Sequence, residues 1–156
     1  MKQPIHQITA TVCGAGTMGA GIAAHLAAAG CKTYLLDIVP AATPADAPAT
    51  SRSSIAHGAL KNLLKSKPPA LMSPKFLKNI EPGNFDDDLQ RAAAESDIVI
   101  EAVVERLDVK QELFRRLAAA AGPETIFGTN TSGIPIGEIA EALPEDVKRR
   151  FLGLHF

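Results

Sequence analysis

The stretch Gly14-Ala15-Gly16-Thr17-Met18-Gly19 decides the fold, because of what stands on either side of it. Residues 8–12 before it, Ile-Thr-Ala-Thr-Val, predict a strand that ends at the glycines. Residues 18–29 after it carry apolar and small side chains all round, which is typical of a buried helix. A second apolar run at residues 33–36 predicts another strand. A strand, a glycine turn, a helix and a second strand in this order predict two parallel strands joined by a right-handed crossover.

The rest of the chain repeats the alternation of strands and helices. We expect further helices at residues 55–65, at 86–94, from 109 to near Gly122, and at 135–143, and further strands near 78–80 and at 98–104, 125–129 and 151–155. Three prolines between residues 39 and 49 forbid a regular helix and predict an irregular loop. Residues 1–156 are therefore predicted to form one α/β domain, a doubly wound parallel sheet of six strands in three layers, which is the Rossmann fold.

Composition excludes several classes of function. The 156 residues suffice for one hydrophobic core, and 16 basic against 17 acidic side chains leave a net charge of −1, which excludes the broad basic surface that binds nucleic acid. No apolar run approaches the length of a membrane span, and the first residues do not resemble a signal peptide. Two cysteines, Cys13 and Cys31, are too few for a disulfide framework or a metal cluster, so we expect small buried thiols, no metal and a cytoplasmic location.

The glycine stretch predicts a dinucleotide site, because each of its glycines has a physical task. Gly14 permits a tight turn, Gly16 lets the backbone approach a pyrophosphate, and Gly19 lets helix and strand pack closely. Thr17 and Met18 open the helix, whose N-terminal N–H groups and positive dipole favour phosphate. A glycine turn that merely caps a helix is the simpler alternative, but the flanking strand and helix argue against it.

Asp37 selects between the two nicotinamide dinucleotides. It stands at the end of the second strand, 18 residues after Gly19. A carboxylate there accepts hydrogen bonds from the adenosine ribose and repels a 2′-phosphate. We therefore expect NAD rather than NADP as the cofactor. The glycine stretch does not predict the reaction, because many dehydrogenase families share it.

Three further segments are expected at strand ends that converge on the cofactor. They are Glu101-Ala102-Val103-Val104-Glu105 with Lys110 after it, Asn130-Thr131-Ser132, and Gly153-Leu154-His155-Phe156. Together with residues 14–23, and in this order over nearly the whole chain, they resemble the NAD-binding domain of the L-3-hydroxyacyl-CoA dehydrogenases of fatty-acid β-oxidation.

The resemblance implies a role for five residues. His155 matches the catalytic histidine, which takes the proton from the 3-hydroxyl of the substrate while hydride leaves for the nicotinamide. Ser132 matches a serine that hydrogen-bonds the substrate oxygen. Glu105, Lys110 and Asn130 match positions that contact the cofactor. The set is chemically coherent, because imidazole is a suitable base near neutral pH and a hydroxyl donor steadies an oxygen that becomes a carbonyl.

The resemblance also implies the activity and the partners. The reaction is oxidation of an L-3-hydroxyacyl-CoA to a 3-ketoacyl-CoA with reduction of NAD, by a parent that is either monofunctional or fused to an enoyl-CoA hydratase. In the family, a glutamate that orients the imidazole and a helical domain with most dimer contacts follow the histidine, whereas this chain stops at Phe156. We therefore expect a cofactor-binding half, inactive alone, whose partners are the 3-hydroxyacyl-CoA, the missing helical domain and a second subunit in a homodimer.

Each residue also has a structural alternative. His155 is a satisfied structural histidine in one reading, and Glu101 is a buried, paired carboxylate with a structural task. Lys110 is then a solvated helix residue, and the segment 130–132 forms a turn or caps a helix. For the whole domain, the alternatives are another β-hydroxyacid or sugar dehydrogenase and a non-catalytic NAD-binding protein.

Overall fold

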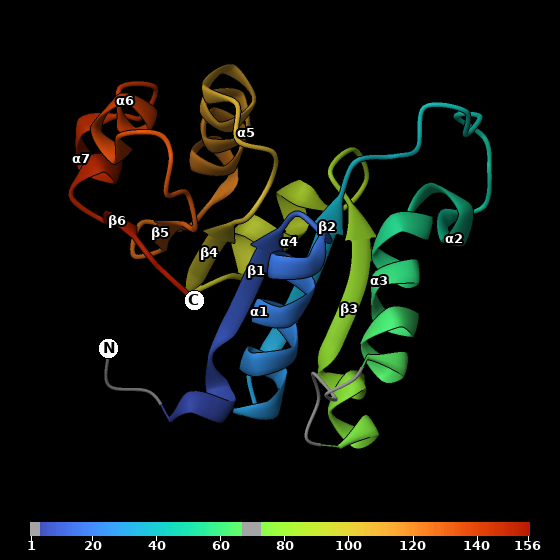
Figure 1. Ribbon diagram of the computed structural model, residues 1–156. Coiled ribbons are helices and arrows are strands. Elements are labelled where there is room, and N and C mark those ends of the chain that lie inside the picture. The colour runs from blue at the N-terminus through green and yellow to red at the C-terminus, as the bar shows by residue number, and fades with distance from the viewer. Residues whose placement is uncertain (1–3, 67–72) are drawn as a thin grey trace.

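The computed structural model describes residues 4–66 and 73–156. In this part of the chain, one all-parallel sheet of six strands has the order β3-β2-β1-β4-β5-β6 (Figure 1). The strands are β1 (Thr9–Cys13), β2 (Lys32–Asp37), β3 (Ile80–Asn84), β4 (Ile98–Glu101), β5 (Ile126–Thr129) and β6 (Phe151–Gly153). This order reverses between β1 and β4, as in dinucleotide-binding sheets, so the predicted doubly wound fold is confirmed.

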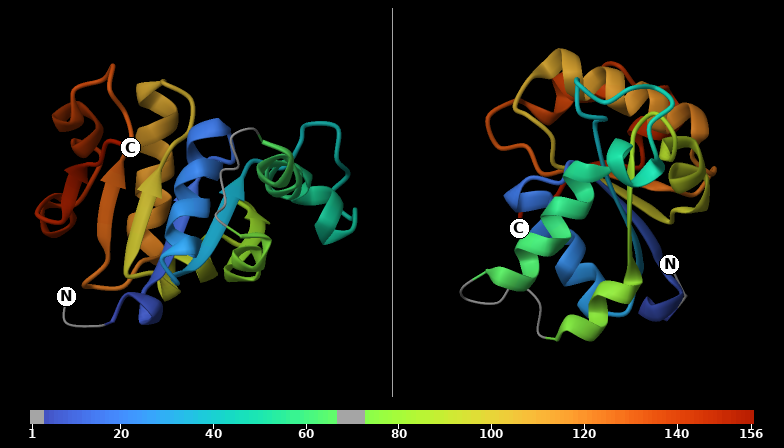
Figure 2. Two further views of the ribbon diagram at one scale, coloured as in Figure 1. Left: turned by 60° about the horizontal axis from the view of Figure 1, so that its bottom comes forward. Right: turned by 90° about the vertical axis from the view of Figure 1, so that its right-hand side faces the viewer.

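Helices cover both faces of the sheet, which gives the three layers that the sequence predicts (Figure 2). The α-helices are α1 (Thr17–Ala28), α2 (Ala49–Arg52), α3 (Ser54–Lys65), α4 (Leu89–Glu95), α5 (Leu107–Ala120), α6 (Ile136–Ala140) and α7 (Glu145–Lys148), and short 3-10 helices lie at Ile5–Gln7 and Pro74–Asn79. Helices α1 and α3 share one hydrophobic cluster with the sheet, and α4 to α7 share the other. The two clusters make the sheet a buried middle layer.

Small side chains set the distance between α1 and the sheet. Ala20, Ala23, Ala24 and Ala27 are buried on the inner side of this helix. A side chain on Gly19 would collide with the carbonyl of Gly14, so the first turn of the helix packs directly on the turn before it. After the helix, Gly30 has a φ of +100°, a conformation that glycine adopts without strain, and it ends α1 as predicted.

The third strand differs from the prediction. Residues 78 and 79 belong to the 3-10 helix Pro74–Asn79, and β3 instead runs from Ile80 to Asn84 through Pro82 and Gly83. Proline is compatible with this strand because β3 is at the edge of the sheet, where one side of the backbone needs no partner. The segment Glu81-Pro82-Gly83 resembles a turn in the sequence, and its strand geometry comes from pairing with β2.

Other boundaries were also predicted wrongly. The sixth strand, expected at 151–155, ends at Gly153. The fourth strand ends at Glu101, not at residue 104, because the Glu101 carboxylate accepts the N–H of Val103 and turns the chain. Helix α4 begins at Leu89, since the N–H groups of residues 86 and 87 bind the side-chain oxygen of Asn84. The helix expected at 135–143 is shorter, and α7 was not expected. The irregular loop at 39–49 is confirmed up to residue 48, where α2 follows.

Candidate functional site

The glycine turn lies where the strand order reverses, at the carboxyl end of β1. Gly14 has a φ of +106°, and a side chain there would collide with the carbonyl of Ala102 after β4. Its N–H donates to the carbonyl of Leu36 at 2.7 Å, which ties the turn to β2. Only glycine fits at this position, because both the conformation and the space exclude a side chain.

The same turn fits a dinucleotide pyrophosphate. A side chain on Gly16 would have no atom within 4 Å, so the backbone here borders open space. Gly16 is also the N-cap of α1, and no side chain caps this helix. Gly16, Thr17 and Met18 line a cleft, and the helix directs its N-terminal N–H groups and dipole there. The arrangement that the sequence predicts for phosphates is therefore present.

Asp37 lies on the other side of this turn, at the end of β2. Its Oδ2 accepts the N–H of Ala15 at 2.5 Å, and its Oδ1 accepts the N–H of Ile38 at 2.7 Å. The carboxylate therefore holds the glycine turn and also lines the cleft. Both oxygens retain lone pairs for further donors, as a ribose contact requires.

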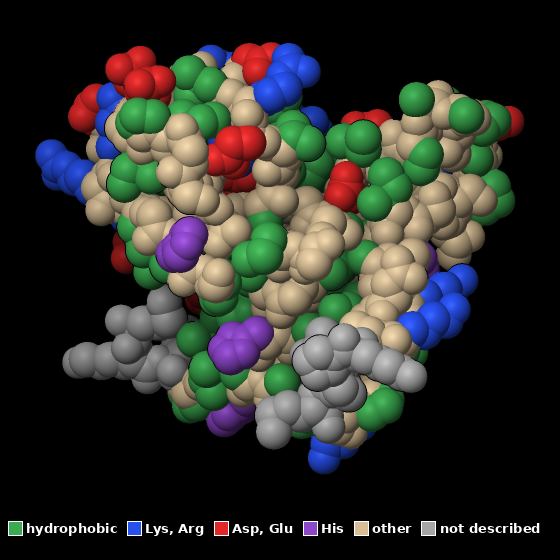
Figure 3. Space-filling model, viewed as in Figure 1, with side chains coloured by type: hydrophobic (Ala, Val, Ile, Leu, Met, Phe, Trp, Pro, Cys, Tyr) green, Lys and Arg blue, Asp and Glu red, His purple; other side chains and the backbone are tan. Residues whose placement is uncertain are grey.

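The cleft has a volume of about 850 Å³ and extends from the glycine turn to α5. In Figure 3 the outline of the molecule is notched between α5 and the loop at residues 38–48, with acidic side chains beside the notch. Its walls include Val104, from the predicted segment 101–105, and three apolar residues that the sequence did not indicate, namely Ile38, Phe85 and Val109. Ile38 and Val104 are 59% and 62% exposed, which is high for aliphatic side chains and suits a surface that a flat ring covers. Ile38 and Phe85 directly follow strands, so their places in the sequence could have indicated that they line the cleft.

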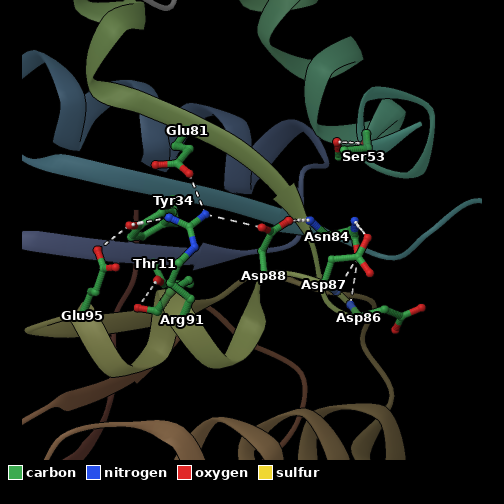
Figure 4. A network of polar contacts seen from close by, with 12 residues as sticks. Thr11, Tyr34, Ser53, Glu81, Asn84, Asp86, Asp87, Asp88, Arg91 and Glu95 are labelled. Carbon is green, nitrogen blue, oxygen red and sulfur yellow. Dashed lines mark hydrogen bonds and ion pairs between the residues drawn. The ribbon is translucent and has the colours of Figure 1, made fainter. Parts of the chain in front are cut away.

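A polar network beside β3, drawn in Figure 4, fixes the turn that carries Phe85, a residue of the cleft wall. Asp88 accepts the N–H of Asn84 at 3.0 Å, and the Asn84 amide donates to Asp87 at 2.9 Å. Arg52 donates to both oxygens of Asp87, at 2.7 and 2.9 Å. These contacts fix the turn that carries Phe85, whose carbonyl also accepts a hydrogen bond from Arg116 at 2.6 Å.

A buried ion pair lies below the second half of the sheet's carboxyl edge. The side chains of Glu101 and Lys110 are 0% and 1% exposed, and their Oε1 and Nζ atoms are 2.7 Å apart. The prediction of Glu101 as a buried, paired carboxylate is confirmed, whereas the alternative of a solvated Lys110 is wrong. The contact between Lys110 and the cofactor stays a prediction, since its ammonium group faces Glu101 and the carbonyl of Val103.

Glu105 connects this pair to the loop after β5. Its Oε2 lies 3.6 Å from the Lys110 ammonium, and its Oε1 accepts the N–H of Gly133 at 2.7 Å. The backbone N–H of Gly133, then Lys110 and the N–H of Ser132, lower the pKa of the Glu105 carboxyl, so it is ionised at neutral pH. Glu105 therefore fixes the backbone that carries Ser132.

Ser132 and His155 follow the neighbouring strands β5 and β6 and are both exposed. The N–H of Leu154 donates to the carbonyl of Thr129 at 2.9 Å. The N–H of Phe156 donates to the side chain of Asn130 at 3.3 Å. His155 is thus held between two hydrogen bonds to the β5 segment that leads to Ser132. Ser132 caps no helix, because the N-cap of α6 is Pro135.

The two thiols are buried and unpaired, as the sequence predicts. Burial, together with the charges of Glu101 and Asp37, raises the pKa of the Cys13 thiol, which therefore stays protonated. Within residues 4–66 and 73–156, no group of three or more His, Cys, Asp or Glu side chains has the geometry to hold a metal ion. In the same ranges, no helix is long and apolar enough to cross a membrane.

Comparison with known proteins identifies the family. Residues 9–156 match the family described as 3-hydroxyacyl-CoA dehydrogenase, NAD binding domain. A probable 3-hydroxyacyl-CoA dehydrogenase from Bacillus subtilis is 42% identical over 97% of this chain, and one from Deinococcus radiodurans is 40% identical over 94%. The crystal structure of the Escherichia coli 3-hydroxybutyryl-CoA dehydrogenase has a TM-score of 0.70 and 35% identity over 96% of this chain.

These relatives are longer than the present chain. It spans 20% of the length of the Bacillus protein, 40% of the Deinococcus protein and 29% of the Escherichia coli chain. The matched part contains the glycine turn, Asp37, and the segments after β4, β5 and β6. The chain therefore belongs to the family of the NAD-binding domain of 3-hydroxyacyl-CoA dehydrogenases.

Proposed function

We propose that this chain is the cofactor-binding part of an enzyme that oxidises L-3-hydroxyacyl-CoA to 3-ketoacyl-CoA with NAD as the oxidant. The observation that carries the proposal is the position of His155. The hydrogen bonds of Leu154 and Phe156 to the β5 segment hold it beside the loop of Ser132, in the half of the sheet opposite Asp37. A base and a hydroxyl donor on neighbouring strand ends suit the oxidation of an alcohol.

The residues of this chain have distinct tasks in the proposed reaction. NAD, when bound, supplies the two-electron acceptor. The His155 imidazole accepts the proton of the 3-hydroxyl group. The Ser132 hydroxyl donates to the same oxygen as it becomes a carbonyl. Glu105 fixes the loop that carries Ser132, and Asn130 holds the backbone of Phe156, next to His155. The turn formed by Gly14, Gly16 and Gly19 presents Gly16, Thr17 and Met18 to the pyrophosphate, and Asp37 binds the adenosine ribose.

A titration tests the cofactor part of the proposal. Calorimetry with NAD and NADP should show binding of NAD and little binding of NADP. Asp37→Ala removes ribose acceptors and the charge that repels a 2′-phosphate, so NAD binding should weaken about tenfold and the preference over NADP should fall. Asp46→Ala is the matched control, because it removes an exposed acid of the neighbouring loop that does not line the cleft. Unchanged affinities in Asp37→Ala would contradict the assignment of Asp37.

An activity assay tests the reaction. The full-length protein that carries this chain should oxidise NADH when acetoacetyl-CoA is added, and His155→Gln should lower kcat by a factor on the order of 10²–10⁴. Ser132→Ala should lower kcat less. Activity only with a different hydroxyacid or a sugar would favour another dehydrogenase, and NAD binding without turnover of any of them would favour a non-catalytic protein. This chain alone should bind NAD without turnover, because the substrate also needs the helical domain.

The remaining partners belong to the same proposal. The substrate is a 3-hydroxyacyl-CoA, the helical domain completes the site, and the assembled enzyme is a homodimer. We place the enzyme in the cytoplasm, which the two unpaired thiols, Cys13 and Cys31, support because they suit a reducing compartment. Fractionation of cells, together with light scattering of the full-length protein, tests the compartment and the dimer.

A further inference from the structure

Glu101 is an ionisable group that the proposed reaction does not use. It stands at the carboxyl end of β4, and its side chain is not exposed at all. Its Oε1 accepts the N–H of Val103 at 2.6 Å and the ammonium of Lys110 at 2.7 Å. A buried carboxylate costs free energy unless it is paired and hydrogen-bonded, and this oxygen has both kinds of partner.

The second oxygen of Glu101 reaches the next strand. Its Oε2 accepts the hydroxyl of Thr129 at 2.6 Å and that of Thr131 at 3.4 Å. The Thr129 hydroxyl in turn accepts the N–H of Thr131 at 3.3 Å. The segment directly before Ser132 is therefore fixed from below by one carboxylate.

The contacts continue from Lys110 to the far side of the same loop. The Lys110 ammonium lies 3.6 Å from Glu105, and Glu105 accepts the N–H of Gly133. The loop from Thr129 to Gly133 is thus held at both ends by groups that converge on Glu101. The Glu101 side chain therefore connects four pieces of backbone. They are the turn after β4, helix α5, the end of β5 and the loop after β5.

The position of this cluster assigns it to one half of the cofactor. A doubly wound sheet has two mononucleotide-binding halves. Asp37 and the glycine turn belong to the adenosine half, over β1 to β3. The loop after β5 and Glu105 belong to the other half, over β4 to β6, where a bound NAD would place its nicotinamide nucleotide.

We propose that Glu101 is a positioning residue for the nicotinamide half of the NAD site, acting through Thr129, Thr131 and the Lys110–Glu105 pair without touching the cofactor. The inference rests on the proposed function, since it requires that NAD binds across both halves. Loss of Glu101 weakens binding of the nicotinamide nucleotide and leaves binding of the adenosine half unchanged.

Comparing two ligands tests this inference. NAD and ADP-ribose share the adenosine and pyrophosphate groups, and only NAD carries nicotinamide. In Glu101→Gln, which keeps the shape and removes the charge, calorimetry should show an NAD dissociation constant raised about tenfold. The constant for ADP-ribose should stay within about twofold of that of the unchanged protein. A purely structural role would weaken binding of both ligands equally.

Two further variants keep the test decisive. Thr129→Val removes one hydrogen bond to Glu101 without leaving a buried charge unpaired. It should therefore raise the dissociation constant of NAD relative to that of ADP-ribose, but less than Glu101→Gln does. It carries the test if Glu101→Gln does not fold. Leu63→Ala in α3 destabilises the core away from this half and should leave the ratio unchanged at a temperature where the variant is folded.

The outcomes separate the two proposals. The positioning role is supported if the dissociation constant of NAD rises relative to that of ADP-ribose in Glu101→Gln and Thr129→Val, and if Leu63→Ala leaves this ratio of constants unchanged. Equal weakening of both ligands, or no change, overturns the inference about Glu101 while NAD binding by the unchanged chain still stands. Failure of the unchanged chain to bind NAD overturns the proposed function and this inference with it.

Discussion

The two polar networks of this domain use the same kinds of side chain in different surroundings. On the β3 side, Arg91 binds Glu81 at 2.6 Å, and these side chains are 46% and 45% exposed (Figure 4). On the β4 side, Lys110 binds Glu101 at 2.7 Å, and both are buried. The distances hardly differ, but water screens the first pair and not the second. The contact distances therefore do not show which pair contributes more to stability, whereas the difference in burial does.

The largest expected effect follows from breaking the buried pair. Lys110→Met leaves the Glu101 carboxylate in the interior without its charge partner, so the free energy of unfolding should fall by about 3–5 kcal/mol. Urea denaturation at neutral pH measures this difference. The hydrogen bonds from Val103 and Thr129 remain, so the variant should still fold.

Two variants make the loss specific to the unpaired charge. The double variant Glu101→Gln/Lys110→Met removes both charges and should recover part of the lost stability, because replacing a whole buried pair costs less than breaking it. Lys61→Met, at an exposed position of α3, should change stability by less than about 0.5 kcal/mol. Equal losses in the single and the double variant would contradict the comparison of the two networks.

The sequence predicted the glycine turn and Asp37 well, because their signals are local. Gly14, Gly16 and Gly19 occur within six residues, and their spacing already implies the turn, the open space at Gly16 and the close packing that the structure shows. Asp37 was predicted by its distance along the chain from Gly19 and lies beside the turn. For these residues, order along the chain and position in space carry the same information.

The sequence predicted other parts of the domain less well, because their contacts depend on tertiary structure. Lysines on helices are usually solvated, and nothing in the residues around Lys110 indicates that α5 buries it against Glu101. The strand expected near residues 78–80 was placed too early for a related reason, since Pro82 and Gly83 resemble a turn and only pairing with β2 extends them. Ile38 and Phe85 could have been predicted from their places after strands, once the strand order was known.

A smaller effect is expected when the exposed network is broken. Arg91 binds Glu81 and lies over the Tyr34 ring, with its guanidinium carbon 5.0 Å from the ring centre. Solvent screens both contacts, so Arg91→Ala should lower the free energy of unfolding by at most about 1 kcal/mol. A double-mutant cycle with Glu81→Gln, repeated at 0.05 and 1 M salt, should show a coupling that falls as salt rises. If Arg91→Ala lowered the free energy of unfolding as much as Lys110→Met does, burial would not decide which network contributes more to stability.

The smallest expected effect concerns the pH dependence of the exposed network. The bidentate contact from Arg52, with help from Asn84, lowers the pKa of the Asp87 carboxyl to about 2. Since the folded-state pKa is below the ordinary Asp value of ~3.9, this contact stabilises the fold fully above that value, and the contribution disappears as pH falls toward 2. The difference in stability between the unchanged chain and Arg52→Met should therefore be constant from about pH 7 to 5 and narrow toward pH 3. Asp46→Asn is the control, because this exposed acid lies outside the network and should leave the narrowing unchanged. A difference that stays constant down to pH 3 would show that Arg52 stabilises the turn through its packing and its hydrogen bond to Ala45 rather than through the charge of Asp87.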